Sequence, residues 1–442
     1  MPICLIASGD YFSSYGGGQV YVKNLVHALA QRSHACCVIS IRHVPDATGS
    51  EPIRRDDAGV AVWQLDVSSM NAVGRQTLDL QAATPLCKLL KTIAPNVVHA
   101  HGWKAATATV CKELHIPCVV TAHHGGIVCP NGALMNQHDA ICALPASMKN
   151  CLKCALHFVP GGDFWSPLVR FLPLNLSLRI ADALHGVPNI PYISPAFKTP
   201  LSIMRKMHDI SVLRNCPDRI IAPSAAIGTA LARNGIPQNK IVRIPHGIPL
   251  PSWQPPKPAL VNGPLRFIYV GRISYIKGIH VMLAAFLSLP PEQYELHIVG
   301  GAVTKPEKRY LGRLKREFSG VNAIWHGACD QETVMKKLAD SDVMVHPAIC
   351  LEIFGLTIAE ALAVGRPVIA SRCGGAEAQI RDEENGWLVP PNDVCALRNV
   401  ITRVIVQPDL IRRLADSLNC VRSIEDHVDD LLQLYALVGA TN

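Results

Sequence analysis

Short apolar runs alternate along the chain with segments in which apolar residues recur at helical spacing. In the first half we expect buried strands at four of these runs: Ile3–Ala7, Cys36–Ile41, Val97–His101 and Val119–Ala122. After the first run, one helical face collects six residues: Val20, Tyr21, Asn24, Leu25, Ala28 and Leu29. This alternation predicts βαβ units with parallel sheets.

A proline-rich segment of low charge, PHGIPLPSWQPPKPALVNGP, interrupts the pattern at residues 245–264. Proline fixes φ and lacks the backbone donor that regular structure needs, so we expect a linker over 246–264. A second strand series follows, at LRFIYVG and then at Glu295–Val299, Val343–His346, Pro367–Ala370 and Trp387–Val389. The sequence therefore predicts two Rossmann-like domains, over residues 1–245 and 265–422.

Composition supports a folded chain of two or three domains. Of its 442 residues, 49% are hydrophobic and 17% are charged, which excludes a disordered chain. The formal net charge of +8 fits an anionic ligand or membrane surface and is too small to indicate nucleic acid. No apolar run reaches the length of a membrane span, and the start MPICLIASGDYF lacks signal-peptide features, so we expect a cytoplasmic protein.

The stretch from Leu152 to Arg219 fits the βαβ pattern least well. Residues 149–219 hold nine Lys or Arg against four Asp, mixed with aromatic side chains, and we expect no clean amphipathic helix there. Two interpretations are open: a surface that contacts anionic headgroups of a membrane, or an acceptor-domain insertion whose charges are solvated.

The 16 cysteines fall into two groups. Most stand alone in apolar segments and are expected to be reduced core thiols, among them Cys4, Cys111, Cys118 and Cys395. A second group has the spacing C-x12-C-x8-C-x2-C: Cys129, Cys142, Cys151 and Cys154. Four thiolates suit a structural zinc ion or an iron-sulfur cluster, with His138 and His157 as spare ligands. The alternatives are free thiols, or a disulfide in an oxidising compartment.

The segment with the strongest chemical signal is ICLEIFGLTIAEALAVGRPVIASRCGGAEAQI. Glu352 and Glu360 are eight residues apart, and Gly355 suggests that a helix begins near Phe354. A loop followed by a helix N-terminus presents free NH groups that suit a diphosphate, and carboxylates accept hydrogen bonds from sugar hydroxyls. An isolated pair of glutamates at this spacing would more often be a solvated helix face. The surrounding FG, GRPV and GGxE make the segment specific.

This segment resembles the retaining GT-B glycosyltransferases of the large bacterial glycosyltransferase family 4. The resemblance extends to GGGQVYVKNLVHALA, VVHAHGW, TAHHG, IIAPSAAI, IPHGI and YVGRISYIKGIHVMLAAF. It implies two Rossmann-like domains with parallel sheets facing each other across a cleft. We also expect residues 423–442 to form a helix that packs back on the N-terminal domain.

The resemblance implies a donor site in the C-terminal domain. Arg272 and Lys277 would bind the donor diphosphate, Glu360 the ribose hydroxyls and Glu352 the hydroxyls of the donor sugar. Backbone NH groups would contact the phosphates at Phe354, Gly355 and Leu356.

On the N-terminal side, the family positions match a glycine loop and a histidine. Gly16, Gly17 and Gly18 would let the loop approach the phosphates or acceptor, and His123 would line the cleft near the reacting carbon. His101 could face the same cleft. The related subgroup has Asp where this chain has His124, so no acid–base role carries over to that position. A subset of related enzymes has a cysteine-rich insertion like the one at about 125–160, which precedes the basic and aromatic insertion at about 160–218.

The resemblance implies transfer of a sugar from a nucleoside diphosphate sugar to an acceptor hydroxyl, with retention and without a catalytic metal. Such enzymes serve in cell-surface polysaccharide or glycoconjugate synthesis, so the expected partners are a nucleotide sugar and a glycan or lipid-linked acceptor. Peripheral contact with an anionic membrane would follow from the first interpretation of residues 149–219. Two alternatives share the fold: a sugar-nucleotide 2-epimerase and a non-catalytic nucleotide-sugar binder.

Overall fold

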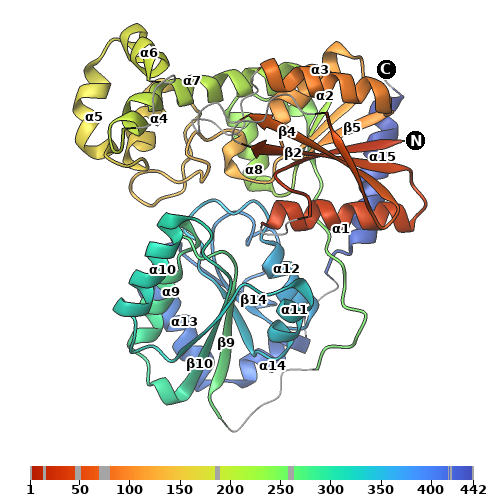
Figure 1. Ribbon diagram of the computed structural model, residues 1–442. Helices are drawn as coiled ribbons and strands as arrows, with labels where there is room; N and C mark the ends of the chain where they lie inside the picture. Colours follow the sequence, from red (N-terminus) through yellow and green to blue (C-terminus); the bar gives the residue numbers. More distant parts are fainter. Residues whose placement is uncertain are drawn as a thin grey trace. The chain divides into compact units, whose positions relative to one another are not determined.

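The computed structural model describes residues 2–12, 16–44, 51–68, 80–184, 190–256, 263–416, 418 and 421–440. The chain forms two compact units (Figure 1). Residues 1–137, 142–245 and 424–442 make up unit 1, and residues 138–141 and 246–423 make up unit 2. The segment 246–264, expected as a linker, is thus grouped with unit 2, and its residues 257–262 lie outside the described residues.

Unit 1 is built on an eight-stranded sheet in the order β3-β4-β2-β1-β5-β6-β7-β8. All neighbours pair in parallel except β3 and β4, which are antiparallel. The strands are β1 Ile3–Ser8, β2 Cys36–Val44, β3 Ile53–Asp57, β4 Val60–Ser68, β5 Val97–Ala100, β6 Cys118–Thr121, β7 Arg219–Ala222 and β8 Ile241–Arg243. Strands β5 and β6 are buried along their whole length, as expected for central strands covered on both faces.

The helices of unit 1 include four in the stretch 149–219. They are α1 Gly17–Gln31, α2 Leu80–Ile93, α3 Lys104–Glu113, α4 Met148–His157, α5 Gly162–Phe171, α6 Leu174–Ala183, α7 Ser194–Asn215, α8 Ala225–Arg233 and α15 Ile424–Gly439, with short 3-10 turns at Gly125–Ile127 and Gln238–Lys240. Helix α15, the last in the chain, packs against α1, the first. Arg32, which follows α1, forms an ion pair with Asp429 of α15.

Unit 2 is built on a six-stranded, fully parallel sheet in the order β11-β10-β9-β12-β13-β14. Its strands are β9 Leu265–Val270, β10 Tyr294–Val299, β11 Ala323–Gly327, β12 Val343–His346, β13 Val368–Ser371 and β14 Gly386–Val389. Its helices are α9 Ile279–Leu287, α10 Lys305–Glu317, α11 Gln331–Ala339, α12 Leu356–Ala363, α13 Val394–Val406 and α14 Asp409–Asp416, with 3-10 turns at Tyr275–Lys277 and Pro291–Gln293.

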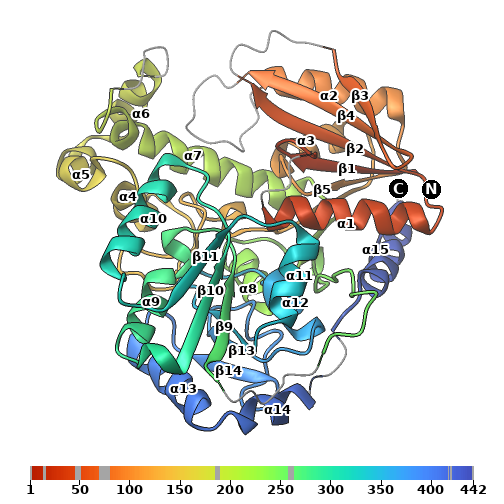
Figure 2. The same ribbon diagram turned by 60° about the horizontal axis from the view of Figure 1, so that its bottom comes forward.

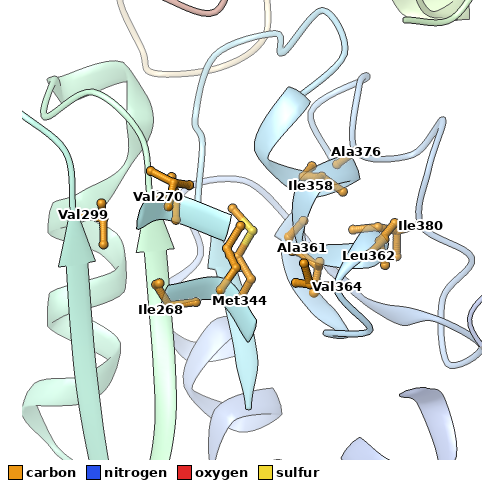
Figure 3. Packing of buried hydrophobic residues seen from close by; sticks show 14 of the residues in the cluster. Ile268, Val270, Val299, Met344, Ile358, Ala361, Leu362, Val364, Ala376 and Ile380 are labelled. Atoms are coloured by element: carbon orange, nitrogen blue, oxygen red, sulfur yellow. The ribbon is translucent and has the colours of Figure 1, made fainter. Parts of the chain in front are cut away.

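The core of unit 2 joins the central strands to α12. Buried Ile268 and Val270 of β9 and Met344 of β12 belong to one cluster with Ile358 and Ala361 of α12 (Figure 3). Burial of this apolar face fixes α12 on the sheet, so the loop that precedes α12 is held at the carboxyl ends of the strands.

One expectation from the sequence, that Cys395 is a core thiol, was wrong. The stretch 149–219 departs from the βαβ pattern as expected: helices α4 to α7 follow one another there, and α5 carries apolar residues on its outward positions as well. Cys395 is exposed at the start of α13, whereas Cys4, Cys111 and Cys118 are buried as predicted. Among the described residues, no helix combines the length and the hydropathy that a membrane span requires.

Candidate functional site

Three polar side chains meet at the carboxyl ends of strands β9 and β12. Lys277 ends the 3-10 turn that follows β9, His346 is the last residue of β12, and Glu352 lies in the loop between β12 and α12. The Lys277 Nζ donates a hydrogen bond to Glu352 Oε2 at 2.5 Å. The Nε2 atom of His346 is 3.4 Å from the same oxygen. In parallel α/β sheets this edge is where ligands bind.

A glycine brings Lys277 to Glu352. Gly278 has φ +68°, and a Cβ added there would lie 1.8 Å from the carbonyl oxygen of Pro347. The turn after β9 therefore lies directly against the segment after β12, where Ile349 N donates to Ile276 O at 3.0 Å. No residue with a side chain fits at Gly278 without moving this segment.

The surroundings keep both members of the pair charged. Burial by itself would raise the pKa of Glu352, but the charge of Lys277 and the nearby His346 hold this pKa well below its ordinary value. Burial opposes the charge of Lys277 in the same way, yet the Glu352 carboxylate raises the Lys277 pKa. Each group is thus ionised because its partner is ionised.

Glu360 occupies a separate, buried position on α12. Gln331, at the start of α11, donates from Nε2 to Glu360 Oε1 at 2.8 Å. Burial raises the pKa of Glu360, and the Gln331 hydrogen bond opposes that rise only in part. A buried carboxylate with an elevated pKa is suited to pairing with the hydroxyl groups of a ligand.

The loop before α12 is held by a second glycine-rich segment. Helix α12 begins at Leu356 after Gly355, which has φ +82°, and no side chain caps it. Gly375 packs so closely that an added Cβ would lie 2.7 Å from the backbone of Phe354. The side chain of Gln379 donates to the carbonyl oxygens of Phe354 and Gly355. The start of α12 is thus fixed in place, with its dipole favouring a negative ligand.

Arg272 also follows β9, but its side chain pairs with Glu307 and not with Glu352. Its side chain is half exposed, and Nε lies 3.2 Å from Glu307 Oε1. Its charge still acts on the thiol of Cys350, as do the charges of Lys277 and Glu352. Arg272 therefore lies near the same edge of the sheet, although the Lys277–Glu352 pair forms without it.

In unit 1, the predicted histidines and glycines come together. His123 follows β6, and its Nε2 is 2.8 Å from Nδ1 of His101, which follows β5. A Cβ on Gly18 would lie 3.9 Å from His123, so the first turn of α1 contacts that side chain. The Tyr21 ring lies 4.8 Å from the His123 ring, centroid to centroid.

Two side chains of helix α15 contact this group of histidine and tyrosine side chains. Tyr21 Oη is 2.6 Å from His427 Nε2, and Tyr435 Oη is 2.6 Å from His99 Nδ1. The other ring nitrogen of His99 is 2.6 Å from the Thr121 hydroxyl. Burial, aided by His427, lowers the pKa of His99 to about 3, so the ring is neutral.

His124 is not equivalent to its neighbour His123. Burial and the charges of Lys104 and Lys206 lower the pKa of His124 to about 3. A ring that is neutral at every physiological pH cannot replace the carboxylate of the related subgroup as an anion.

Two of the four clustered cysteines contact Asn131. Cys129 Sγ is 2.6 Å from Asn131 Oδ1, and Cys154 Sγ is 3.4 Å from Asn131 Nδ2. Burial, and then the mutual charge of Cys129, Cys142 and Cys151, raises the pKa of Cys154 to about 11. The donor chemistry suits a metal, but across the described ranges no three His, Cys, Asp or Glu side chains are arranged to hold one. The metal site stays a prediction.

Several site residues were missed from the sequence: His346, Gln331, Gln379, His427 and Tyr435. His346 carried a usable signal, because it ends a predicted strand at the edge where the other site residues gather. The other four act through contacts between elements that are distant in the sequence.

Comparisons with known protein families match both units. A family described as "Glycosyl transferases group 1" matches residues 254–417, and one described as "Glycosyltransferase Family 4" matches residues 15–141. A "D-inositol 3-phosphate glycosyltransferase" of Xylanimonas cellulosilytica is 29% identical over 422 residues, covering 90% of this chain and 86% of the relative. A "Glycogen synthase" of Mycobacterium tuberculosis is 27% identical, covering 57% of this chain and 63% of the relative.

Solved structures share the fold over essentially the whole chain. Sucrose-phosphate synthase from Thermosynechococcus elongatus aligns with a TM-score of 0.68 and 21% identity, covering 100% of both chains. Anabaena Alr3699/HepE, solved with UDP and glucose, aligns with a TM-score of 0.66 and 16% identity, covering 98% of this chain and 99% of the other. With two α/β units, a Family 4 match in the first and a group 1 match in the second, this chain is a glycosyltransferase of the GT-B fold.

Proposed function

We propose that this glycosyltransferase transfers a sugar from a nucleoside diphosphate sugar to an acceptor hydroxyl, with retention of anomeric configuration. The observation that carries the proposal is the Lys277–Glu352 ion pair at the strand edge of unit 2, directly before the N-terminus of α12. Anabaena HepE, which shares the fold, was solved in complex with UDP-glucose. That supports a nucleotide sugar as the ligand of this edge.

The chemistry requires a cation beside the leaving group. When the bond between the anomeric carbon and the diphosphate breaks, both electrons stay with the diphosphate, and its negative charge grows. Lys277 is ionised and already near the loop that precedes α12, so its ammonium group can turn from Glu352 to the phosphate oxygens. Stabilising charge that develops in the transition state is the largest common source of catalysis.

The two glutamates have separate roles in this proposal. Glu352 is ionised, lies next to Lys277, and would accept hydrogen bonds from hydroxyls of the donor sugar. Glu360 lies on α12, eight residues after Glu352, and accepts a hydrogen bond from Gln331. It would accept further hydrogen bonds from the ribose hydroxyls. The backbone of Phe354, Gly355 and Leu356 would contact the phosphates, with Arg272 released from Glu307 as a second cation.

In unit 1, we propose His123 as the residue nearest the acceptor and the reacting carbon. Gly18 in the first turn of α1 lies beside it, and Gly17 precedes Gly18 at the start of the helix, so neither position puts a Cβ in the way of a substrate. The acceptor would be a glycan or a lipid-linked sugar of cell-surface synthesis.

A thermal-shift screen against UDP, GDP, ADP and their sugars tests the donor site. A ligand at a hundred times its Kd adds about 2.7 kcal/mol to the stability of the folded chain, which is several degrees in Tm. We expect one nucleotide series to stabilise the wild type and to lose most of its effect with Lys277→Ala. Lys336→Ala is the matched control, because Lys336 forms an exposed pair with Glu332 at 2.6 Å outside the site. If the nucleotide raised the Tm of Lys277→Ala as much as that of Lys336→Ala, the donor would bind away from Lys277.

Incubation with the nucleotide sugar alone separates transfer from the two alternatives. A transferase without acceptor hydrolyses its donor slowly and leaves the remaining donor sugar unchanged. Accumulation of an epimerised nucleotide sugar would instead indicate a 2-epimerase. Binding without turnover in the presence of any acceptor would indicate a non-catalytic binder.

A further inference from the structure

Helix α5 in unit 1 has two apolar faces, and only one of them is packed. Trp165 and Val169 face inward, in a cluster with Leu156, Ala196 and Phe197. The outward face carries Phe164, Pro167, Leu168 and Phe171, which follow the i, i+3, i+4, i+7 spacing of a helical stripe. An ordinary surface helix places polar residues on that face.

The outward stripe is among the most exposed apolar surface of the molecule. Phe164 is 78% exposed, Leu168 47% and Phe171 87%. Leu174 and Leu176, at the start of α6, continue the exposed apolar surface beyond the end of α5. More than half of the exposed large apolar side chains of the described residues fall between Phe158 and Met207. Such concentration marks an interaction surface, since scattered single residues are the norm.

Cations flank this stripe. Arg170 and Arg179 are exposed on α5 and α6, and Lys149 and Lys153 are exposed on α4, the neighbouring helix. Of the two acidic residues among the described positions of α4 to α6, Asp163 has both carboxylate oxygens 3.0 Å from Nδ1 of His157. The surface therefore combines protruding aromatic and aliphatic side chains with an excess of positive charge.

The helices that carry the stripe lie at the outer end of α7, away from the sheet of unit 1, in both views (Figure 1, Figure 2). At this position the stripe can contact a flat surface without displacing any part of the sheet. Helix α5, with ten residues, is about 15 Å long. That is half of what is needed to cross a bilayer, so it can only lie in the interface.

We propose that the outward face of α5 and the start of α6, comprising Phe164, Leu168, Phe171, Leu174 and Leu176 with Arg170 and Arg179, docks on an anionic lipid bilayer. The aromatic and leucine side chains enter the boundary between headgroups and acyl chains, and the arginines pair with anionic headgroups. This docking goes beyond the proposed transfer reaction and does not depend on it, because it is measured without any sugar substrate.

Vesicle flotation of the full chain tests the proposal. The vesicles are phosphatidylcholine alone, or phosphatidylcholine with phosphatidylglycerol. We expect the wild type to float with the anionic vesicles and much less with the neutral ones. The double variant Phe164→Ser/Phe171→Ser should bind the anionic vesicles at least about tenfold more weakly. Arg170→Gln/Arg179→Gln should remove most of the preference for anionic lipid.

Val303→Ser/Val406→Ser is the matched control, since both valines are exposed apolar residues of unit 2 outside the site. It should bind like the wild type. Equal melting temperatures show that the variants are folded, because the replaced side chains are exposed. Absence of wild-type binding to either vesicle, or unchanged binding by the phenylalanine variant, would overturn the proposal. So would light scattering that shows a wild-type dimer lost in the phenylalanine variant without vesicle binding, since the stripe would then hold a second copy.

Discussion

The Lys277–Glu352 pair, proposed to bind the donor, also carries an energetic cost. Its side chains are 22% and 16% exposed, so both charges are largely removed from water. Each partner compensates the desolvation of the other, and loss of one leaves the other uncompensated. The pair is therefore expected to affect stability as well as donor binding.

Glu352→Gln should destabilise the chain at neutral pH by about 3 kcal/mol, because Lys277 would keep its charge without a countercharge. The pKa of Glu352 is depressed in the folded state, so its contribution is present above the ordinary value of 4.5 and is lost as pH falls below it. The stability difference between wild type and variant should thus shrink from about pH 5 downward. Urea unfolding at a series of pH values measures it. A difference that is constant with pH would show that the pair does not titrate as proposed.

At the scale of elements, strand ends and the last helix together build the histidine cluster. His101 and His123 follow adjacent parallel strands, so the order of β5 and β6 in the sheet brings them to one edge. Helix α15 contributes His427 to Tyr21 and Tyr435 to His99, across more than 300 positions in the sequence. The end of the chain thereby supports the residue proposed to face the acceptor.

Tyr21→Phe and His427→Phe should each destabilise unit 1 by about 1–3 kcal/mol, since each leaves a buried polar atom without this partner. The double variant should lose less unfolding free energy than the two single variants together, because neither Tyr21 nor His427 is then left without the other. Urea unfolding gives the three free energies. Leu437→Ala, on an exposed position of α15, is the control and should have little effect. Strict additivity would show that the two side chains do not interact.

The cysteine group makes a separate prediction at this scale. If Cys129, Cys142, Cys151 and Cys154 rearrange around a metal, chain purified under anaerobic conditions should carry about one zinc ion or one iron-sulfur cluster. Cys151→Ser/Cys154→Ser should lose it, whereas Cys395→Ser, an exposed thiol elsewhere, should not. Metal analysis of the three proteins decides. Wild-type chain without metal would leave these residues as free thiols.

At the scale of the whole molecule, much of the fold was predictable because its central strands are continuous apolar runs. Strands β1, β5, β9 and β12 are of this kind. Strand β3, IRRDD, was missed because it lies at an edge of the sheet and is mostly exposed and charged. Helix α7 was missed because Pro195 lies in its first turn and Pro200 lies inside it.

Some residues of the candidate site could be predicted from the sequence and others could not. Lys277, Glu352 and Glu360 could be proposed from motifs, because their positions follow from local spacing between strand, glycine and helix. Gln331 and His427 could not, because their roles depend on how α11 packs near α12 and how α15 packs on α1. Arg272 was expected on the diphosphate, and its contact with Glu307 could not be read from the motif that contains it.

The most direct test of the central claim is turnover of the nucleotide sugar identified by the thermal-shift screen, followed as release of nucleoside diphosphate. We predict that Lys277→Ala and Glu352→Ala each lower this rate by about a hundredfold to a thousandfold, the loss typical of a group that stabilises transition-state charge. Lys336→Ala should release nucleoside diphosphate at the wild-type rate. Wild-type turnover by either site variant, with the protein folded, would contradict the assignment of Lys277 and Glu352 to the donor site.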